Sequence, residues 1–125
     1  MNVTFDFRCV IWPEAPVDAA AHFYSELAPQ VREILSGGLL ADLPDLDRPP
    51  DVAAVIFPEA DHTHRSWRLA AIQALAREVA PKRVNGIEAS GEDDEAVDAM
   101  ADWLAQAEAI TGQLLTIDGN SSAKG

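Results

Sequence analysis

Residues 51–57 read DVAAVIF, a continuous apolar run that follows a single aspartate. Such a run is typical of a strand buried on both faces, as the strands of a parallel sheet are. Residues 63–80 come next and carry apolar side chains at helical spacing, and residues 84–87 read VNGI, which favours a second short strand. A strand, a helix and a strand in this order predict a βαβ unit, and therefore an α/β fold.

The residues before this unit predict one more strand and one more helix. Residues 2–12 alternate between apolar and polar side chains, which is typical of an edge strand with one wet face. Residues 18–36 have an apolar stripe at helical spacing, with Asp18 as the expected N-cap. We expect Pro29 to kink this helix, because proline removes a backbone hydrogen bond, and the glycine pair 37–38 to end it.

The residues after the unit continue the alternation. Ser90 is the expected cap of an acidic helix, and residues 110–117 are expected to form a last strand. The core face of that helix is predicted to comprise Val97, Met100, Ala101 and Leu104. The whole pattern predicts a reduced Rossmann-like fold of three layers around a small, mostly parallel sheet of about four strands.

Length and composition bound the class of protein. The chain has 125 residues, 48% of them hydrophobic, so we expect a single domain over residues 1–120 and a flexible tail at residues 121–125. The formal net charge of −12 argues against binding to nucleic acid or to anionic membranes, since both require clustered cations. Cys9 is the only cysteine, and no signal peptide or long apolar segment is visible, so we expect a cytoplasmic protein without an internal disulfide.

Three segments of the second half resemble one known family. Residues 76–81 read AREVAP, residues 83–85 read RVN, and residues 110–119 read ITGQLLTIDG. In this order they resemble the short-chain dehydrogenase/reductase (SDR) family, in which a segment like LALELAP is followed by RVN and later by ITGQxxxVDGG. The likeness extends over residues 65–119, just under half of the chain.

The resemblance places other residues where the family has its catalytic pair. Counting back along the helix puts Asp61 at the family's tyrosine and Arg65 at its lysine, and neither can perform the proton transfer, since Asp is normally ionised and Arg does not deprotonate. Tyr24 is the only tyrosine, and Lys82 and Lys124 are the only lysines, so no Tyr-x-x-x-Lys exists in the chain.

The cofactor motif of the family is missing as well. A glycine-rich turn requires closely spaced glycines after a first strand, because a helix N-terminus must approach a pyrophosphate there. No such turn can be written here, where the glycines stand at 37, 38, 86, 91, 112, 119 and 125. The resemblance therefore implies a truncated and degenerate SDR relative that lacks the N-terminal glycine-rich nucleotide-binding half, binds no cofactor within one chain and is catalytically inactive.

The helix at residues 63–80 has two apolar stripes that lie almost opposite each other. One stripe can cover the sheet, and the other requires either a neighbouring helix of the same chain or another subunit. We favour another subunit, because this helix and the preceding one form a subunit contact in the family. The interface candidates are Trp67, Ala70, Ala71, Ala74, Tyr24, Leu27 and Val31. The resulting hypothesis is an accessory protein that forms a dimer or tetramer with itself or assembles with a full-length SDR subunit.

The alternative hypothesis is a small-molecule-binding protein or a divergent enzyme. Residues 58–65 read PEADHTHR and follow the buried strand, where open α/β sheets bind ligands. The pocket candidates are Asp61, His62, His64 and Arg65. We expect no metal, because His-x-His is common without one and nothing at ligand spacing supports it. Arg65 and Arg68 are expected to form ordinary ion pairs rather than an anion site, and Trp67 and Trp103 to anchor a core or an interface.

Overall fold

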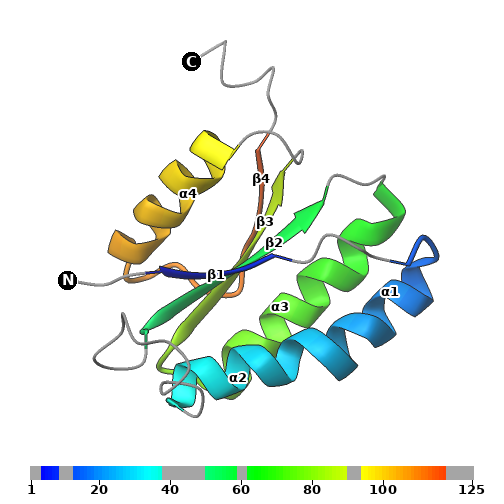
Figure 1. Ribbon diagram of the computed structural model, residues 1–125, viewed down its shortest axis with the longest axis horizontal. Coiled ribbons are helices and arrows are strands. Elements are labelled where there is room, and N and C mark those ends of the chain that lie inside the picture. The colour runs from blue at the N-terminus through cyan, green and yellow to red at the C-terminus, as the bar shows by residue number, and fades with distance from the viewer. Residues whose placement is uncertain (1–3, 9–12, 38–49, 59–61, 90–93, 118–125) are drawn as a thin grey trace.

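The computed structural model describes residues 4–8, 13–37, 50–58, 62–89 and 94–117. Its centre is a four-stranded parallel sheet in the order β1-β2-β3-β4, as Figure 1 shows. The strands are β1 (Thr4–Arg8), β2 (Val52–Pro58), β3 (Arg83–Ala89) and β4 (Leu114–Ile117). The predicted parallel sheet is confirmed, and β1 lies at its edge as the alternating pattern indicated.

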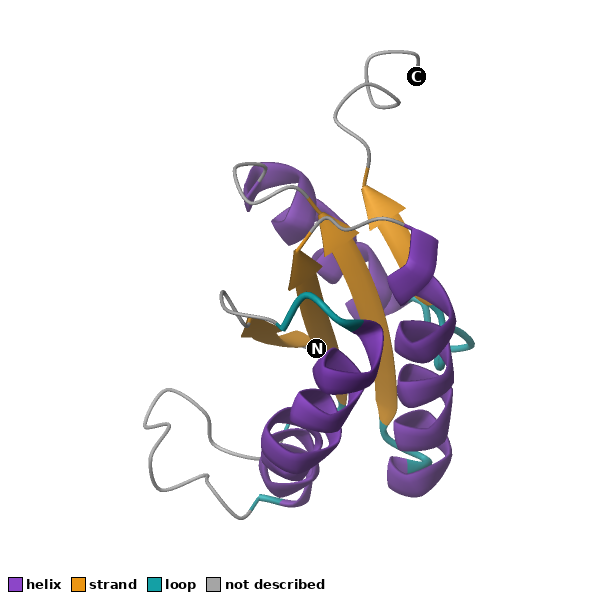
Figure 2. Ribbon diagram, turned by 90° about the vertical axis from the view of Figure 1, so that its right-hand side faces the viewer, coloured by secondary structure: helices purple, strands orange, loops and turns teal. Residues whose placement is uncertain are grey.

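Helices cover both faces of this sheet. One face carries a long helical segment made of α1 (Pro16–His22), a π-helical turn η1 (Phe23–Leu27) and α2 (Ala28–Ser36), with α3 (Arg65–Val79) beside it. The other face carries α4 (Asp94–Gln106). Figures 1 and 2 show the three layers that result. The reduced Rossmann-like α/β fold expected from the sequence is therefore confirmed.

Side chains from alternate positions of β2 enter two separate cores. Ala53, Val55 and Phe57 pack with η1, α2 and α3, whereas Ala54 and Ile56 pack with α4. All five side chains are at most 4% exposed. The continuous apolar run at residues 51–57 exists because both faces of this strand are covered.

The two crossovers in the second half have opposite hands. The connection from β2 through α3 to β3 and the connection from β3 through α4 to β4 advance in the same direction across the sheet, but they pass over opposite faces. Parallel β-α-β connections are right-handed in about 98% of cases, so one of these two has the rare hand. Among the described residues, the hand change places α4 on one face of the sheet and the other helices on the opposite face.

The first helical segment differs from its prediction at its N-cap. Asp18 is not the N-cap: Ala15 holds that position, followed by Pro16, whose missing N–H costs nothing in a first turn. At Pro29 the expected interruption is present: the π-helical turn η1 ends at Leu27, and a new helix, α2, begins at Ala28 with the proline in its first turn. Gly37, at φ 91°, ends α2 in the left-handed conformation, as expected.

The second apolar stripe of α3 is covered in part within the chain, and Ala70 of this stripe stays exposed. Ala71 is fully buried and packs in one cluster with Leu27 and Val31 of the first helical segment. The ring centroids of Phe23 and Trp67 are 6.0 Å apart across the same contact. The apolar stripe on residues 18–36 packs against α3. Periodicity alone could not show whether these two stripes pair within one chain or between two chains.

The remaining helix predictions agree where the structure describes them. Val97, Ala101 and Leu104 are buried on α4, and Met100 packs against them half-buried. The cap at Ser90 and the tail at residues 121–125 lie outside the described residues. Within the described part of the chain, no helix has the length and apolar character needed to cross a membrane.

Candidate functional site

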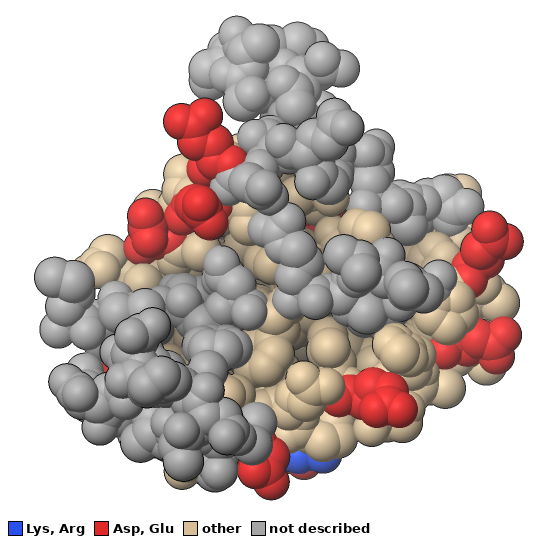
Figure 3. Space-filling view, viewed as in Figure 1, with Lys and Arg blue, Asp and Glu red and all other residues tan. Residues whose placement is uncertain are grey.

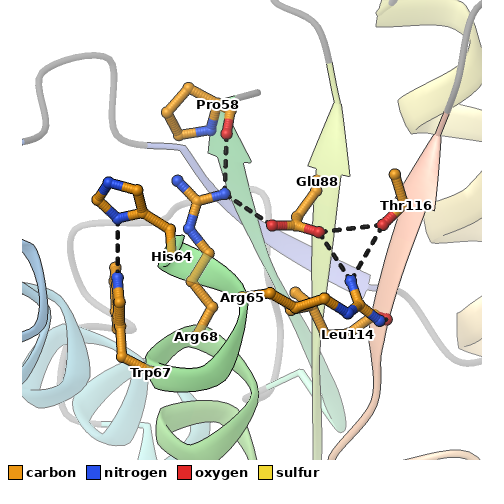
Figure 4. Close-up of polar contacts among 8 residues, drawn as sticks. All are labelled: Pro58, His64, Arg65, Trp67, Arg68, Glu88, Leu114 and Thr116. Atoms are coloured by element: carbon orange, nitrogen blue, oxygen red, sulfur yellow. Dashed lines mark hydrogen bonds and ion pairs between the residues drawn. The ribbon is translucent and has the colours of Figure 1, made fainter. Parts of the chain in front are cut away.

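The carboxyl ends of β2, β3 and β4 meet at one edge of the sheet, beside the first turn of α3. Figure 4 shows that two arginines of this turn, Arg65 and Arg68, converge there on one carboxylate, Glu88 of β3. This edge is where open α/β sheets bind their ligands, and where the sequence indicated a site.

Arg68 is a buried cation held under this edge. Its side chain is 2% exposed, and Nη1 donates hydrogen bonds to Glu88 Oε2 at 2.8 Å and to the carbonyl of Pro58 at 2.9 Å. The guanidinium carbon lies 4.8 Å from the ring centroid of Phe57 and 5.9 Å from that of Trp67. Nε is buried with no hydrogen-bond acceptor among the described residues. The charge is thus stabilised by one carboxylate and two aromatic faces.

Burial lowers the pKa of Arg68 from its ordinary value, and the hydrogen bond and charge of Glu88 partly oppose this shift. Arginine nevertheless keeps its proton under all conditions in which proteins are folded. Arg68 therefore acts as a permanent positive charge and not as an acid or a base.

Arg65 lies at the solvent side of the same carboxylate. Its side chain is half exposed, and Nη1 is 3.0 Å from Glu88 Oε1 and 3.3 Å from Thr116 Oγ1. Nη2 donates to the carbonyl of Leu114 at 3.3 Å. Thr116 also donates to Glu88 Oε1 at 3.0 Å. Arg65 thus bridges the ends of β3 and β4, and the expectation of an ordinary ion pair for Arg65 and Arg68 agrees with these contacts.

Sequence reasoning missed Glu88 and Thr116. Glu88 shares the α3 side of β3 with Val84 and Gly86, and a carboxylate on the covered face of a strand requires a partner. The need for a partner could therefore have been predicted from the sequence. The partners themselves could not, because most of α3 separates Arg65 and Arg68 from Glu88 in the chain.

His64 is engaged at both ring nitrogens. Trp67 Nε1–H donates to His64 Nδ1 at 2.9 Å, so Nδ1 is the acceptor and Nε2 carries the proton that is donated to the Glu14 carbonyl, also at 2.9 Å. His64 is 8% exposed. A neutral ring with this tautomer has no lone pair left for a metal, and its role is to hold the start of α3 to the residues before α1.

The other candidates from the sequence are not brought together with His64. His62 is exposed, and Asp61 lies outside the described residues. No group of three or more His, Cys, Asp or Glu side chains suited to a metal occurs among the residues that the structure describes. Of the interface candidates, Leu27, Val31 and Ala71 are buried, Trp67 and Ala74 are half-buried, and Tyr24 and Ala70 are exposed.

The segments that carry the family resemblance hold the second half of the fold together. Arg83 donates to the carbonyls of Leu104, Ala105 and Ala107 at the end of α4, at distances of 2.7–3.2 Å. The positive charge therefore lies at a helix C-terminus and satisfies carbonyls that have no partner within the helix.

The asparagine of the same RVN segment holds the loop before β4. Asn85 Nδ2 donates to the Ile110 carbonyl at 3.2 Å, and Asn85 Oδ1 accepts from the backbone N–H of Gln113 at 3.1 Å. Gly112, at φ 73°, places its own N–H 2.8 Å from the Val84 carbonyl. The RVN and ITGQ segments of this chain thus satisfy backbone groups of one another.

These contacts define a Rossmann-like α/β protein whose candidate site lies at the carboxyl edge of a parallel sheet. A model of the SDR-like family, short chain dehydrogenase-like protein, matches residues 7–117, and the chain belongs to this family. No curated protein and no solved structure shows a significant match to the chain. The match begins within β1 and includes the first helical segment, to which the resemblance seen in the sequence did not extend.

Proposed function

We propose that this SDR-like chain catalyses no dehydrogenase reaction of its own and acts as an accessory subunit, bound to a second copy of itself or to a full-length SDR subunit. The absence of catalysis is supported by the contacts of Arg65, which stands at the position that resembles the family's lysine. Its guanidinium is bound to Glu88, Thr116 and the Leu114 carbonyl at the end of the sheet.

The chemistry of hydride transfer supports the same proposal. Reduction of a carbonyl requires a proton donor beside the reacting oxygen. Asp61 stands where the resemblance puts the family's tyrosine, and the only tyrosine, Tyr24, is on η1 and half exposed. Arg65 and Arg68 keep their protons, so neither can replace the missing acid.

Three features favour a binding role. Tyr24 and Trp103 are 50% and 54% exposed, although large aromatic side chains contribute most to stability when they are buried. In the described part of the chain, β4 pairs with β3 alone, so its outer edge is available for a partner strand. Ala70 is an exposed small residue on α3 that allows close approach of another helix.

Ligand binding around His62 remains the alternative proposal. Its support is the position of the segment after β2, and it is weakened because both nitrogens of His64 are already engaged. Titration of His62 by NMR, with and without nicotinamide nucleotides and small carbonyl compounds, tests it. A His62 signal that no compound shifts removes its motivation.

The enzymatic part is tested with the purified chain. We expect no binding of NADH or NADPH by calorimetry and no oxidation of either with a panel of carbonyl compounds. The matched variant is the double substitution Asp61→Tyr and Arg65→Lys, which restores the family pair; we expect it to stay inactive. Turnover by the unmodified chain overturns this part of the proposal.

The accessory role is tested by native mass spectrometry of the protein purified gently from its own cells. A mass at a whole multiple of the single chain supports self-assembly, and a mass that includes one full-length SDR chain supports the mixed complex. A single-chain mass at all concentrations tested contradicts both.

A further inference from the structure

Helix α4 presents a tryptophan to solvent on the side opposite its core contacts. Trp103 is 54% exposed, whereas Val97 and Leu104 of the same helix are at most 1% exposed. Ala99, one turn before Trp103, is also exposed. An exposed aromatic beside a small residue on a regular helix provides an anchor with an adjacent shallow place for a partner's side chain.

A row of carboxylates runs along one side of Trp103. Glu95, Asp98 and Asp102 are exposed, and their spacing of three and four residues aligns them over roughly 10 Å of helix. Helix α4 has no lysine or arginine in its sequence. Figure 3 shows Asp and Glu side chains gathered over α4.

These carboxylates are not used within the described part of the fold. The ion pairs of the described residues connect Arg32 with Glu78, Arg65 and Arg68 with Glu88, and Lys82 with Asp51. None of them involves α4. A row of unpaired like charges on one helix raises the energy of the isolated protein and is relieved by a cationic partner.

We infer that the exposed face of α4 docks a cationic amphipathic helix of a partner protein. The partner's Lys or Arg side chains would pair with Glu95, Asp98 and Asp102, while its apolar side chains or a guanidinium cover the ring of Trp103. A second copy does not fit this face, because two acidic rows would meet in a chain of net charge −12. Nucleic acid and anionic lipid are excluded here by the same sign of charge.

This inference rests on the accessory role proposed above and specifies the chemistry of one partner surface. It is independent of α3 and of the carboxyl edge of the sheet, because α4 lies on the opposite face of the sheet from α3. A partner bound through α4 would leave the edge of β4 available for a second subunit.

The test uses a fluorescein-labelled synthetic helical peptide with lysines at positions i, i+3 and i+7 and leucines on the adjoining face, titrated with the full chain and followed by anisotropy. We expect saturable binding that weakens as salt is raised. Trp103→Ala should raise Kd by about tenfold or more, and Trp103→Phe should retain most of the affinity. The same peptide with glutamates in place of lysines should not bind.

Two matched controls separate the α4 face from general acidity. Tyr24→Ala removes another half-exposed aromatic, on the opposite face of the sheet, and should leave Kd unchanged. The double variant Asp98→Asn and Asp102→Asn should flatten the salt dependence, whereas Glu26→Gln with Glu33→Gln, an equal change of charge away from α4, should not.

Each outcome decides the inference separately from the proposed function. The inference is overturned if the lysine peptide does not bind at low salt. It is also overturned if the peptide binds equally to the wild type and to Trp103→Ala while the two proteins have the same circular dichroism. A native complex that persists in Trp103→Ala leaves the accessory role intact and contradicts docking through the α4 face. Turnover of a nicotinamide cofactor, with Trp103-dependent peptide binding retained, overturns only the absence of catalysis.

Discussion

Arg68 and Glu88 form an ion pair under the carboxyl edge of the sheet, with 2.8 Å between Arg68 Nη1 and Glu88 Oε2 and side chains that are 2% and 13% exposed. Arg65 binds the other oxygen of the same carboxylate from the solvent side. The two arginines thus depend on Glu88 to different degrees. A desolvated charge depends on its partner, whereas a half-exposed one is largely stabilised by water.

Replacement of Glu88 by Gln should therefore destabilise the fold by about 3 kcal/mol, because it leaves the Arg68 charge buried without a counter-charge. Urea unfolding followed by circular dichroism measures the change. The control is Arg65→Met, which removes only the exposed pair and should cost about 1 kcal/mol or less. The double variant Arg68→Met and Glu88→Leu should be more stable than Glu88→Gln alone. Equal effects of Glu88→Gln and Arg65→Met would contradict the buried role of Arg68.

Ala70 and Ala71 are neighbours on α3 with opposite environments. Ala71 is fully buried between the sheet and the first helical segment, and Ala70 is exposed. Ala71→Arg should unfold the chain, at a cost of about 4 kcal/mol or more, because it places a charge in the core. Ala70→Arg should leave the thermal unfolding midpoint within a few degrees of the wild type. A soluble, folded Ala71→Arg variant would show that this stripe is not covered within the chain.

The architecture of the second half was predictable, because each element has a strong local pattern. The apolar run at residues 51–57 is typical of a strand buried on both faces, and the periodicity of α4 identified Val97 and Leu104 as core residues. The π-helical turn before Pro29 has no comparable signal. Proline removes a backbone hydrogen bond, and a π-helical turn and a broken helix are both compatible with that loss.

The contacts of the candidate site were less predictable, since they join residues that are distant in the sequence. The sequence predicted an ordinary ion pair for Arg68, but not that its side chain is buried or that its partner is Glu88, 20 residues later in the chain. The partner of the second apolar stripe on α3 was ambiguous for the same reason. A stripe indicates that something covers it, and only the tertiary arrangement identifies the first helical segment of the same chain.

Gly86 lies in β3 where three side chains meet. A Cβ atom at this position would be 2.9 Å from Leu114 Cδ1, 3.0 Å from Phe57 Cε2 and 3.2 Å from Ile72 Cγ1. Gly86→Ala should therefore lower the free energy of unfolding by about 1–3 kcal/mol through overpacking, although alanine in a strand is ordinarily more stable than glycine. Thermal unfolding measures the loss. In a Leu114→Ala background the same substitution should cost less, because the nearest methyl group is gone. A stabilised Gly86→Ala variant would contradict the close approach of these side chains.

Arg83 joins β3 to the end of α4 by three hydrogen bonds to backbone carbonyls, with a side chain that lies on the face opposite Val84. Arg83→Met keeps much of the side-chain volume but removes the donors and the charge at the helix C-terminus, and it should cost about 3 kcal/mol. Arg83→Lys should recover part of this loss, since a single ammonium cannot reach three separated carbonyls in the geometry of a guanidinium. Arg77→Met, at an exposed position of α3, is the matched control and should stay within about 0.5 kcal/mol of the wild type.

Hydrogen exchange should report the loss locally: amides in the last turn of α4 should exchange faster in Arg83→Met, while those in the middle of α3 change only with global stability. Uniform changes in both helices would show that Arg83 acts on the whole core and not as the cap of α4.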